Sequence, residues 1–483
     1  MLKNILLYTF LCSILGCGSI FGTMSGNQTD TLSPILSETS LPFRIQIDQV
    51  DFSLPNGIHS GVSAVYKGKW VFLAGRTNGM HGFNSDPNNF PPQQQNTVVY
   101  VVDPVKKTVI SRSLTEPVSG LSQAQIDSLS VTSPQSYQAG KTLYITGGYG
   151  VDTATGQFST KPLLTAIDIP GLIHWVTNPY PTETLIQYIR QISSPLFQVT
   201  GGYMTQIGKN PMLLVFGQNF LGYYFDPAPP HAQEYTEQIR RFQIIDDGNT
   251  LRVAIESSMP AIKEPSYRRR DLSVVPVISS QRGKAVPGLV AFSGVFTLNE
   301  GIWTVPVSIT ANGTPSMANL SLQETFKQGM NNYDCPVVGL FSKKQKNMYT
   351  IFLGGISFGF FVGDQFQTDS EFPFINQVTT IKIDQKNQFQ QYLMSGQYPV
   401  IPSTQSNPGN PLLFGASAYL MPPTQALSTY KNGVIKLDKI GKQPVVVGYV
   451  VGGIQSTLPN TNTMSDSSAS PYIFKVTLVP VSS

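Results

Sequence analysis

The chain has 483 residues, of which 12% are charged and 41% are hydrophobic, and its formal net charge is +4. About 25% charged residues is usual, so this surface is poor in charge. The aromatic content of 11% excludes a largely disordered chain, because such chains lack aromatic and β-branched residues. The small and dispersed positive charge argues against nucleic acid as a partner.

The first 17 residues have the pattern of an export signal. Lys3 precedes an apolar run over residues 5–11, and the segment ends in Ile14-Leu15-Gly16-Cys17. This pattern is typical of a secretory signal and is too short for a membrane-spanning helix. The ending resembles a bacterial lipobox, which implies cleavage after Gly16, lipidation of Cys17 and anchoring in the bacterial cell envelope, facing the periplasm or the cell surface. An ordinary signal peptide cut within residues 18–23 is the alternative.

The cysteines and the next segment agree with export. Cys12 would leave with the signal and Cys17 would carry lipid, so Cys335 has no partner for an internal disulfide. We expect Cys335 to be a small buried residue. Residues 18–42 are rich in Ser, Thr, Gly and Asn, which predicts a flexible tether. The remaining domain is then 43–483.

A repeat runs through residues 43–483. Each unit has a strand, a tight turn with Lys or Gly, and an apolar strand that ends in a small residue or Gly-Gly. These pairs occupy residues 62–75, 137–148, 201–217, 272–294, 337–355 and, with a longer middle, the stretch that ends at 445–453. A third strand follows each pair after a longer loop, at 97–103, 164–168, 239–244, 302–307, 378–384 and 472–476.

Six four-stranded units in series are typical of a β-propeller. The strand–turn–strand–Gly-Gly layout, with Gly147-Gly148, Gly354-Gly355 and the third strand Tyr100-Val101-Val102-Asp103-Pro104, resembles the kelch family. The resemblance covers residues 43–483 and implies an all-β, six-bladed propeller. Each unit exceeds the usual kelch period of about 50 residues, so long insertions are required. Residues 43–52 alternate like a strand, and we expect them to complete the last blade and close the ring.

One segment departs from the strand pattern. Residues 184–192 show helical spacing, which predicts a short helix packed on the link between the second and third blades.

The insertions fall on one side of the predicted propeller. The first-to-second and third-to-fourth turns share one face and are short, whereas the second-to-third loops and the blade links share the other face and are long. Binding residues concentrate on loops held by a rigid scaffold, so the long-loop face is the expected binding face. The short-turn face is rich in lysine. Two explanations are open: these lysines are ordinary residues of exposed turns, or this face lies against an anionic membrane.

Residues just before each innermost strand should surround the mouth of the central channel on the long-loop face. Those positions carry His59, Tyr137, Gln198, Arg269, Arg270, Asp271, Asp334 and Ser417. A guanidinium fork suits carboxylate or phosphate, so Arg269, Arg270 and the nearby Arg76 are candidate anion clamps. The alternative is that Asp271 pairs with a neighbouring Arg and fixes the link. His59 is a candidate acid–base group or a structural hydrogen-bonding residue.

Aromatic loop residues are further candidates for the binding face. Tyr223 could stack on a sugar or a partner protein, or pack its loop onto the blade. The four histidines have no metal-ligand spacing, so we expect neither a metal nor another cofactor.

These features predict an exported, lipid-anchored binding protein that recognises a carbohydrate or a protein through the long-loop face. The kelch resemblance also implies a sugar-acting enzyme as an alternative, such as a sialic-acid mutarotase-like isomerase. It would use Arg269 or Arg270 for the substrate carboxylate and His59 or Asp271 for proton transfer. A structural scaffold in an envelope complex is the third possibility, and the fold alone does not choose among the three.

Overall fold

The computed structural model describes residues 32–82, 89–224, 231–461 and 463–481. Within these ranges the chain is mainly β-structure, with two α-helices, α1 (Gln123–Leu129) and α2 (Ile169–Thr177). Short 3-10 helices interrupt the loops at η3 (Pro92–Gln94), η4 (Pro117–Ser119), η6 (Pro195–Phe197) and η7 (Pro265–Tyr267). No helix in these ranges has the length and hydrophobicity needed to cross a membrane.

Six antiparallel sheets, here called sheets 1 to 6, each contain four strands of the repeat. Sheet 1 has β3 (Val62–Tyr66), β4 (Lys69–Leu73), β5 (Val98–Asp103) and β6 (Thr108–Ser113). Sheet 2 has β7 (Gln135–Ala139), β8 (Thr142–Thr146), β11 (Leu163–Asp168) and β12 (Ile189–Ser193). Sheet 3 has β13 (Tyr203–Gln206), β14 (Met212–Val215), β17 (Ile239–Asp246) and β18 (Leu251–Met259).

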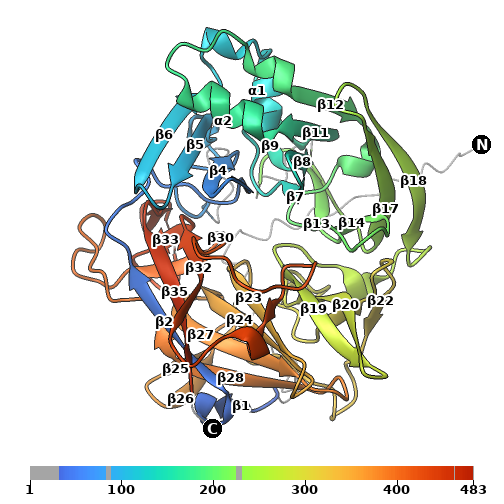
Figure 1. Cartoon of the computed structure of the whole chain (residues 1–483), viewed down its shortest axis with the longest axis vertical. Helices are drawn as coiled ribbons and strands as arrows, with labels where there is room; N and C mark the ends of the chain where they lie inside the picture. Colours follow the sequence, from blue (N-terminus) through green and yellow to red (C-terminus); the bar gives the residue numbers. More distant parts are fainter. Residues whose placement is uncertain (1–31, 83–88, 225–230, 462, 482–483) are drawn as a thin grey trace, which may run out of the picture.

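Sheets 4 to 6 continue the pattern. Sheet 4 has β19 (Ser273–Gln281), β20 (Lys284–Phe292), β21 (Val307–Ile309) and β22 (Pro315–Met317). Sheet 5 has β23 (Val337–Ser342), β24 (Asn347–Ile356), β27 (Phe374–Ile383) and β28 (Phe389–Gln397). Sheet 6 has β30 (Tyr419–Met421), β32 (Val445–Val451), β35 (Ile473–Pro480) and β2 (Phe43–Gln49). The sheets are arranged around a common centre, which makes the fold propeller-like (Figure 1).

Local sequence explains the tight turns between first and second strands. Lys67 and Gly68, between β3 and β4, both have positive φ, at 48° and 77°. Arg282 and Gly283, between β19 and β20, repeat this at 47° and 75°. Two successive positive φ values define the hairpin turn whose twist matches that of its strands, and glycine adopts the second without strain.

The second strands are buried on both sides because each sheet packs between two others. In β4, Val71 and Leu73 belong to an apolar cluster shared with sheet 2. Trp70 and Phe72 belong to a cluster shared with sheet 6, where the ring centroids of Phe72 and Tyr419 lie 5.1 Å apart. Four more clusters join sheets 2 and 3, 3 and 4, 4 and 5, and 5 and 6. The core therefore lies between the sheets.

The N-terminal part of the described chain is docked on sheets 5 and 6. β1 (Ile35–Ser37) pairs in parallel with β28, and η1 (Glu38–Ser40) follows. β2 then pairs with β35 in antiparallel register, from Phe43 opposite Pro480 to Gln49 opposite Phe474 (Figure 1). The flexible tether predicted for 18–42 therefore extends too far, since the chain is already paired from Ile35 on.

Two further expectations were wrong. The helix predicted for 184–192 is instead a 3-10 turn, η5 (Leu185–Tyr188), followed by β12. β12 pairs along β11 as the outer strand of sheet 2, and this pairing overrides the local spacing. The third strand of sheet 4 begins at Val307 rather than at residue 302. Pro306 precedes it and has no N–H to donate to a strand ladder.

The first-to-second connection of sheet 6 is long, unlike its counterparts. Residues 422–444, here called the strap, contain β31 (Ile435–Lys436) and η8 (Leu437–Lys439). β31 pairs in parallel with β23 of sheet 5. Asp438 accepts hydrogen bonds from Ser342 Oγ at 2.7 Å and from the Lys344 N–H at 3.0 Å. This long connection agrees with the longer middle that the sequence predicted for the sixth strand pair.

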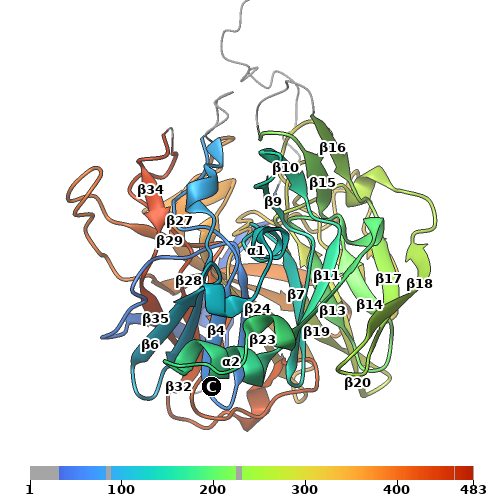
Figure 2. The same cartoon turned by 90° about the horizontal axis from the view of Figure 1, so that it is seen from above.

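The opposite side carries the long connections, as predicted, and these build small sheets of their own. β9 (Tyr149–Asp152), β10 (Gln157–Thr160), β15 (Gln218–Leu221) and β16 (Ala232–Tyr235) form one of them. β25 (Gly359–Val362) and β26 (Gln365–Thr368) form another, and β29 (Leu413–Ala416), β33 (Ile454–Ser456) and β34 (Ser467–Ala469) a third. In Figure 2, β9, β10, β15, β16 and β34 lie on the side opposite α2 and β32.

Candidate functional site

Six residues, one ahead of the innermost strand of each sheet, meet at the long-loop side of the centre. All six have a left-handed backbone, with φ between 49° and 65°: Ser60, Ser133, Gly201, Asp271, Asp334 and Ser417. Except for Asp334, each stands two residues before its strand begins. Such a conformation is uncommon for residues other than glycine. Its recurrence shows that the chain takes the same backbone geometry at the equivalent position of each sheet.

Backbone hydrogen bonds join these six residues in series. The N–H groups of Ser133, Gly201 and Asp271 each donate to the preceding residue of the series, at 2.7, 3.0 and 2.8 Å. Ser60 N–H donates to the Ser417 carbonyl at 3.2 Å, and Ser417 N–H donates to the Asp334 carbonyl at 2.6 Å. Between Asp271 and Asp334 the structure has no such bond. The series is thus interrupted where its two acidic residues stand.

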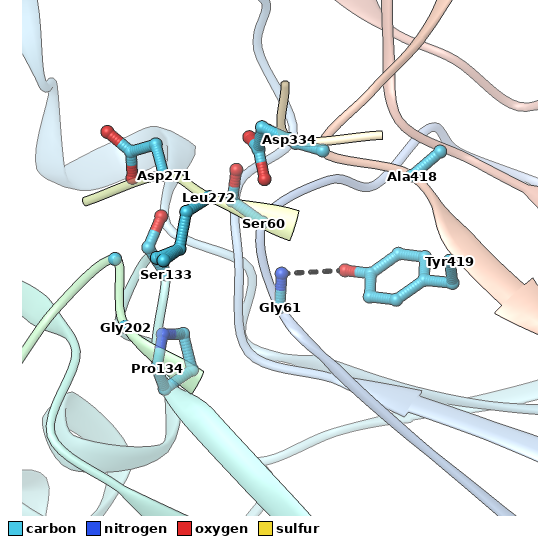
Figure 3. Close-up of a pocket in the computed structure, with 12 residues that line it drawn as sticks. Ser60, Gly61, Ser133, Pro134, Gly202, Asp271, Leu272, Asp334, Ala418 and Tyr419 are labelled. Carbon is cyan, nitrogen blue, oxygen red and sulfur yellow. Dashed lines mark hydrogen bonds between the residues drawn. The ribbon is translucent and has the colours of Figure 1, made fainter. Parts of the chain in front are cut away.

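A cavity of about 140 Å³ opens at this place. Its lining also includes Gly61, Pro134, Gly202, Leu272, Ala418 and Tyr419. Side chains of Asp271, Asp334, Ser60 and Ser133 come from different sheets and gather around one space, while Gly61 N–H donates to Tyr419 Oη at 2.8 Å below it (Figure 3). The lining contains no Lys, Arg or His. Its chemistry is that of two carboxylates and three serine hydroxyls.

Asp334 is the most perturbed acid of this cavity. Burial and, after it, the negative charge of Asp271 raise the pKa of Asp334 from 3.8 to about 7, against the hydrogen bond from Ser417 Oγ. Both effects disfavour the ionised form. Near neutral pH, Asp334 is therefore poised between a carboxylic acid and a carboxylate.

Asp271 is held by Arg270, as the structural alternative anticipated. Arg270 forms an ion pair with the Asp271 carboxylate. It also donates from Nη2 to Tyr224 Oη at 2.6 Å and from Nε to Tyr235 Oη at 3.3 Å. Its guanidinium lies 5.3 Å from the Phe296 ring centroid, and the residue is 8% exposed. Arg270 thus lies behind the cavity, where it positions Asp271.

Arg269 faces away from the cavity, so its assignment as an anion clamp was wrong. It is fully buried, and its Nη1 donates to the Ser293 carbonyl at 3.1 Å. Its guanidinium lies 4.5 Å from the Trp303 ring centroid. Burial lowers the pKa of Arg269 to about 9. Adjacent residues alternate in direction, which explains why only one of the two arginines approaches the mouth.

Arg76 and His59 also have structural surroundings. The two residues exchange backbone hydrogen bonds at 2.9 and 3.1 Å. Arg76 donates to Asn78 Oδ1 at 2.9 Å and lies over the Phe90 ring, 4.9 Å from its centroid. Burial, with a smaller contribution from Arg76, lowers the pKa of His59 to about 3. His59 Nδ1 lies 2.9 Å from Ser60 Oγ, so this neutral ring orients a cavity hydroxyl.

The remaining predicted residues lie outside the cavity lining. Tyr137 is inside strand β7 and packs against the cluster between sheets 2 and 3. Gln198 precedes Gly201, which holds the mouth position of sheet 3. Tyr223 is 36% exposed and packs on Phe158, with ring centroids 5.2 Å apart. The lipidation residue Cys17 lies outside the described residues.

Prediction from sequence found Asp271, Asp334 and Ser417 but missed Ser60, Ser133 and Gly201. The missed residues differ from the predicted ones by one to four positions along the chain. The constant spacing of two residues before the innermost strand would have found them, had the strand starts been known. Among the described residues no three His, Cys, Asp or Glu side chains gather into a metal-binding group.

Comparison with known proteins leaves the family of the chain open. No family model and no curated protein matches it. A solved structure titled "Structure of YjhT" is similar over 88% of this chain and 98% of that chain, with 10% sequence identity and a TM-score of 0.44. A similarity of this size carries no argument about activity.

Proposed function

We propose that this protein is an exported, lipid-anchored, kelch-like β-propeller that binds a carbohydrate in the cavity at the mouth of its central channel. The ligand group we expect there is rich in hydroxyl donors or carries an amine. The observation that carries the proposal is the cavity itself, in which Asp271, Asp334 and three serine hydroxyls converge without a facing cation.

The chemistry of the lining favours this ligand over an acidic one. A sialic-acid carboxylate would need a cation, but Arg269 is turned away and Arg270 is paired with Asp271. Ionised carboxylates accept hydrogen bonds from sugar hydroxyls and pair with ammonium groups. The Ser133 hydroxyl can donate or accept as the ligand requires, and the hydroxyls of Ser60 and Ser417, which contact His59 and Asp334, retain acceptor capacity. In ligand pockets a few precisely placed polar groups of this kind fix the orientation of the ligand and provide specificity.

We further propose that sheets 1 to 6 are six blades and that β2 closes the ring. The series of mouth residues, one from each sheet, supports this arrangement. So does the apolar cluster that joins sheet 6 to sheet 1. Closure leaves no unpaired edge between the first and last segments, and it fixes the six mouth residues relative to one another.

A thermal-shift panel tests the binding proposal. The full chain is mixed with neutral hexoses, amino sugars and sialic acids, and the variants Asp334→Asn and Asp364→Asn are measured in parallel. Asp364 lies on the exposed β25–β26 turn, so its substitution changes charge without touching the cavity. A ligand at about 100 times its Kd stabilises the protein by roughly 2.7 kcal/mol. We expect a neutral or amino sugar to stabilise the wild type and the Asp364→Asn variant but not the Asp334→Asn variant.

Asp334 also favours a second candidate, a sugar isomerase. A general acid or base works best when its pKa lies near the operating pH, and the pKa of Asp334 is raised to about 7. Mutarotation needs a base to take the proton of the anomeric hydroxyl as the C1=O1 bond forms, and an acid to protonate the ring oxygen as the C1–O5 bond breaks. Anomer exchange followed by NMR separates the two functions. Accelerated exchange that is lost in Asp334→Asn supports the isomerase, and binding without acceleration supports a binding protein.

A further inference from the structure

The face opposite the mouth cavity carries a lysine in, or directly after, every first-to-second connection. These six lysines are Lys67, Lys141, Lys209, Lys284, Lys343 and, from the strap, Lys439. All six are exposed, and none of them forms a salt bridge in the described part of the chain. One lysine from each sheet therefore contributes to a broad basic face.

The carboxylates nearest this face are already used inside the protein. Asp438 accepts from Ser342 Oγ and the Lys344 N–H. Asp246 pairs with Arg190 at 2.8 Å. Asp384 accepts from backbone N–H groups of its own turn, at 2.7 and 2.9 Å. These acids hold turns and neighbouring sheets together, so they do not pair with the six lysines.

The strap adds a hollow with a mixed polar and apolar lining to the same face. A cavity of about 190 Å³ lies between its two arms, and Leu427, Ile435 and Ile440 provide apolar lining. Lys436 and Lys439 belong to the same lining. Ile435 is buried in the core between sheets 5 and 6, and Leu427 and Ile440 pack against it, so the two lysines are the charged part of this lining.

We infer that this lysine face docks on an anionic phospholipid bilayer. Lysines spread around the axis match the diffuse negative charge of such a surface, to which each well-placed lysine adds about fivefold in affinity. The six residues of this face are lysines rather than arginines, whose planar guanidinium groups favour bidentate recognition of individual phosphates. This inference goes beyond the proposed function and is independent of the ligand of the mouth cavity. The docked orientation directs that cavity away from the bilayer.

Vesicle flotation tests the inference with the full chain carrying Cys17→Ser, so that no acyl chain contributes. Vesicles of phosphatidylcholine alone are compared with vesicles that also contain the anionic lipid phosphatidylglycerol, which supplies a negative surface potential. One variant combines Lys67→Glu, Lys141→Glu and Lys284→Glu. The charge-matched control combines Lys263→Glu, Lys475→Glu, Gln365→Glu and Gln367→Glu, which lie on the long-loop side or near the long-loop end of β35. All three proteins share the same N-terminal segment, so differences between them report on the lysines.

We expect the wild type and the control to bind the anionic vesicles more tightly than the neutral ones. The face variant should lose at least about 100-fold in affinity for anionic vesicles, from about fivefold per lysine. Equal losses in the face and control variants would overturn the inference, because net charge alone would then explain binding. Equal binding to both vesicle types would also overturn it, as would stronger binding to duplex DNA or full competition by millimolar inorganic phosphate. Circular dichroism and unchanged melting of each variant verify its fold.

Discussion

Replacing Asp334 by Asn should stabilise the protein, and increasingly so as the pH rises. The pKa of Asp334 is raised from 3.8 to about 7 in the folded protein. Between these two values the folded state holds a proton that the unfolded state has released, so stability falls as the pH rises. At 1.36 kcal/mol per pKa unit, ionising Asp334 in place costs up to about 4 kcal/mol. Asparagine retains an oxygen that can accept from Ser417 Oγ but carries no charge.

Urea unfolding at pH 5 and pH 8.5 measures this effect. Asp334 is partly exposed, so solvent screens part of the cost. We therefore expect the advantage of Asp334→Asn over the wild type to grow by about 1–2 kcal/mol between the two pH values. Asp364→Asn, on an exposed turn, provides the control and should show no such change. An advantage that is independent of pH, or that shrinks at pH 8.5, would refute the assignment of a raised pKa to Asp334.

Two further predictions concern stability. A Cβ at Gly147 would lie 1.9 Å from the Val199 carbonyl oxygen, whereas one at Gly140 would meet nothing within 4 Å. Both residues have positive φ, so Gly140→Ala should cost about 1 kcal/mol and Gly147→Ala at least about 4 kcal/mol in urea unfolding; equal costs would contradict the packing described here. Arg269→Leu should lower stability by about 3 kcal/mol, because the Ser293 carbonyl loses its buried donor; an unchanged midpoint would show that the arginine contributes nothing.

The sheet pattern was readable in the sequence because burial on both sides of a strand leaves continuous apolar runs. β24 is an example, since nearly all of Asn347–Ile356 is buried. The structure of segments that pair with residues distant in the chain could not be predicted from the sequence. Residues 189–193 became an outer strand because β11 offered an unpaired edge. Strap residues 422–444 carry no repeat signal, because their pairing with β23 spans about a hundred residues.

Of the residues predicted to surround the mouth of the channel, only Asp271, Asp334 and Ser417 line the cavity. Counting back from the expected start of each innermost strand identified Asp271 and Asp334. Whether an arginine approaches the cavity depends on the direction of its side chain, and this direction reverses between Arg269 and Arg270. The sequence raised the pairing of Asp271 with a neighbouring arginine as an alternative but did not indicate which arginine, and in the structure the partner is Arg270.

Calorimetric titration of a sugar hit from the thermal-shift panel at pH 5.5 and pH 7.5 tests the central claim most directly. Since ionisation of Asp334 is centred at about pH 7, the wild type should bind at least about tenfold more tightly at pH 7.5. Asp334→Asn should bind weakly and equally at both pH values. A wild-type affinity that is the same at both pH values, or a variant that shows the same rise, would contradict binding through the carboxylate of the mouth cavity.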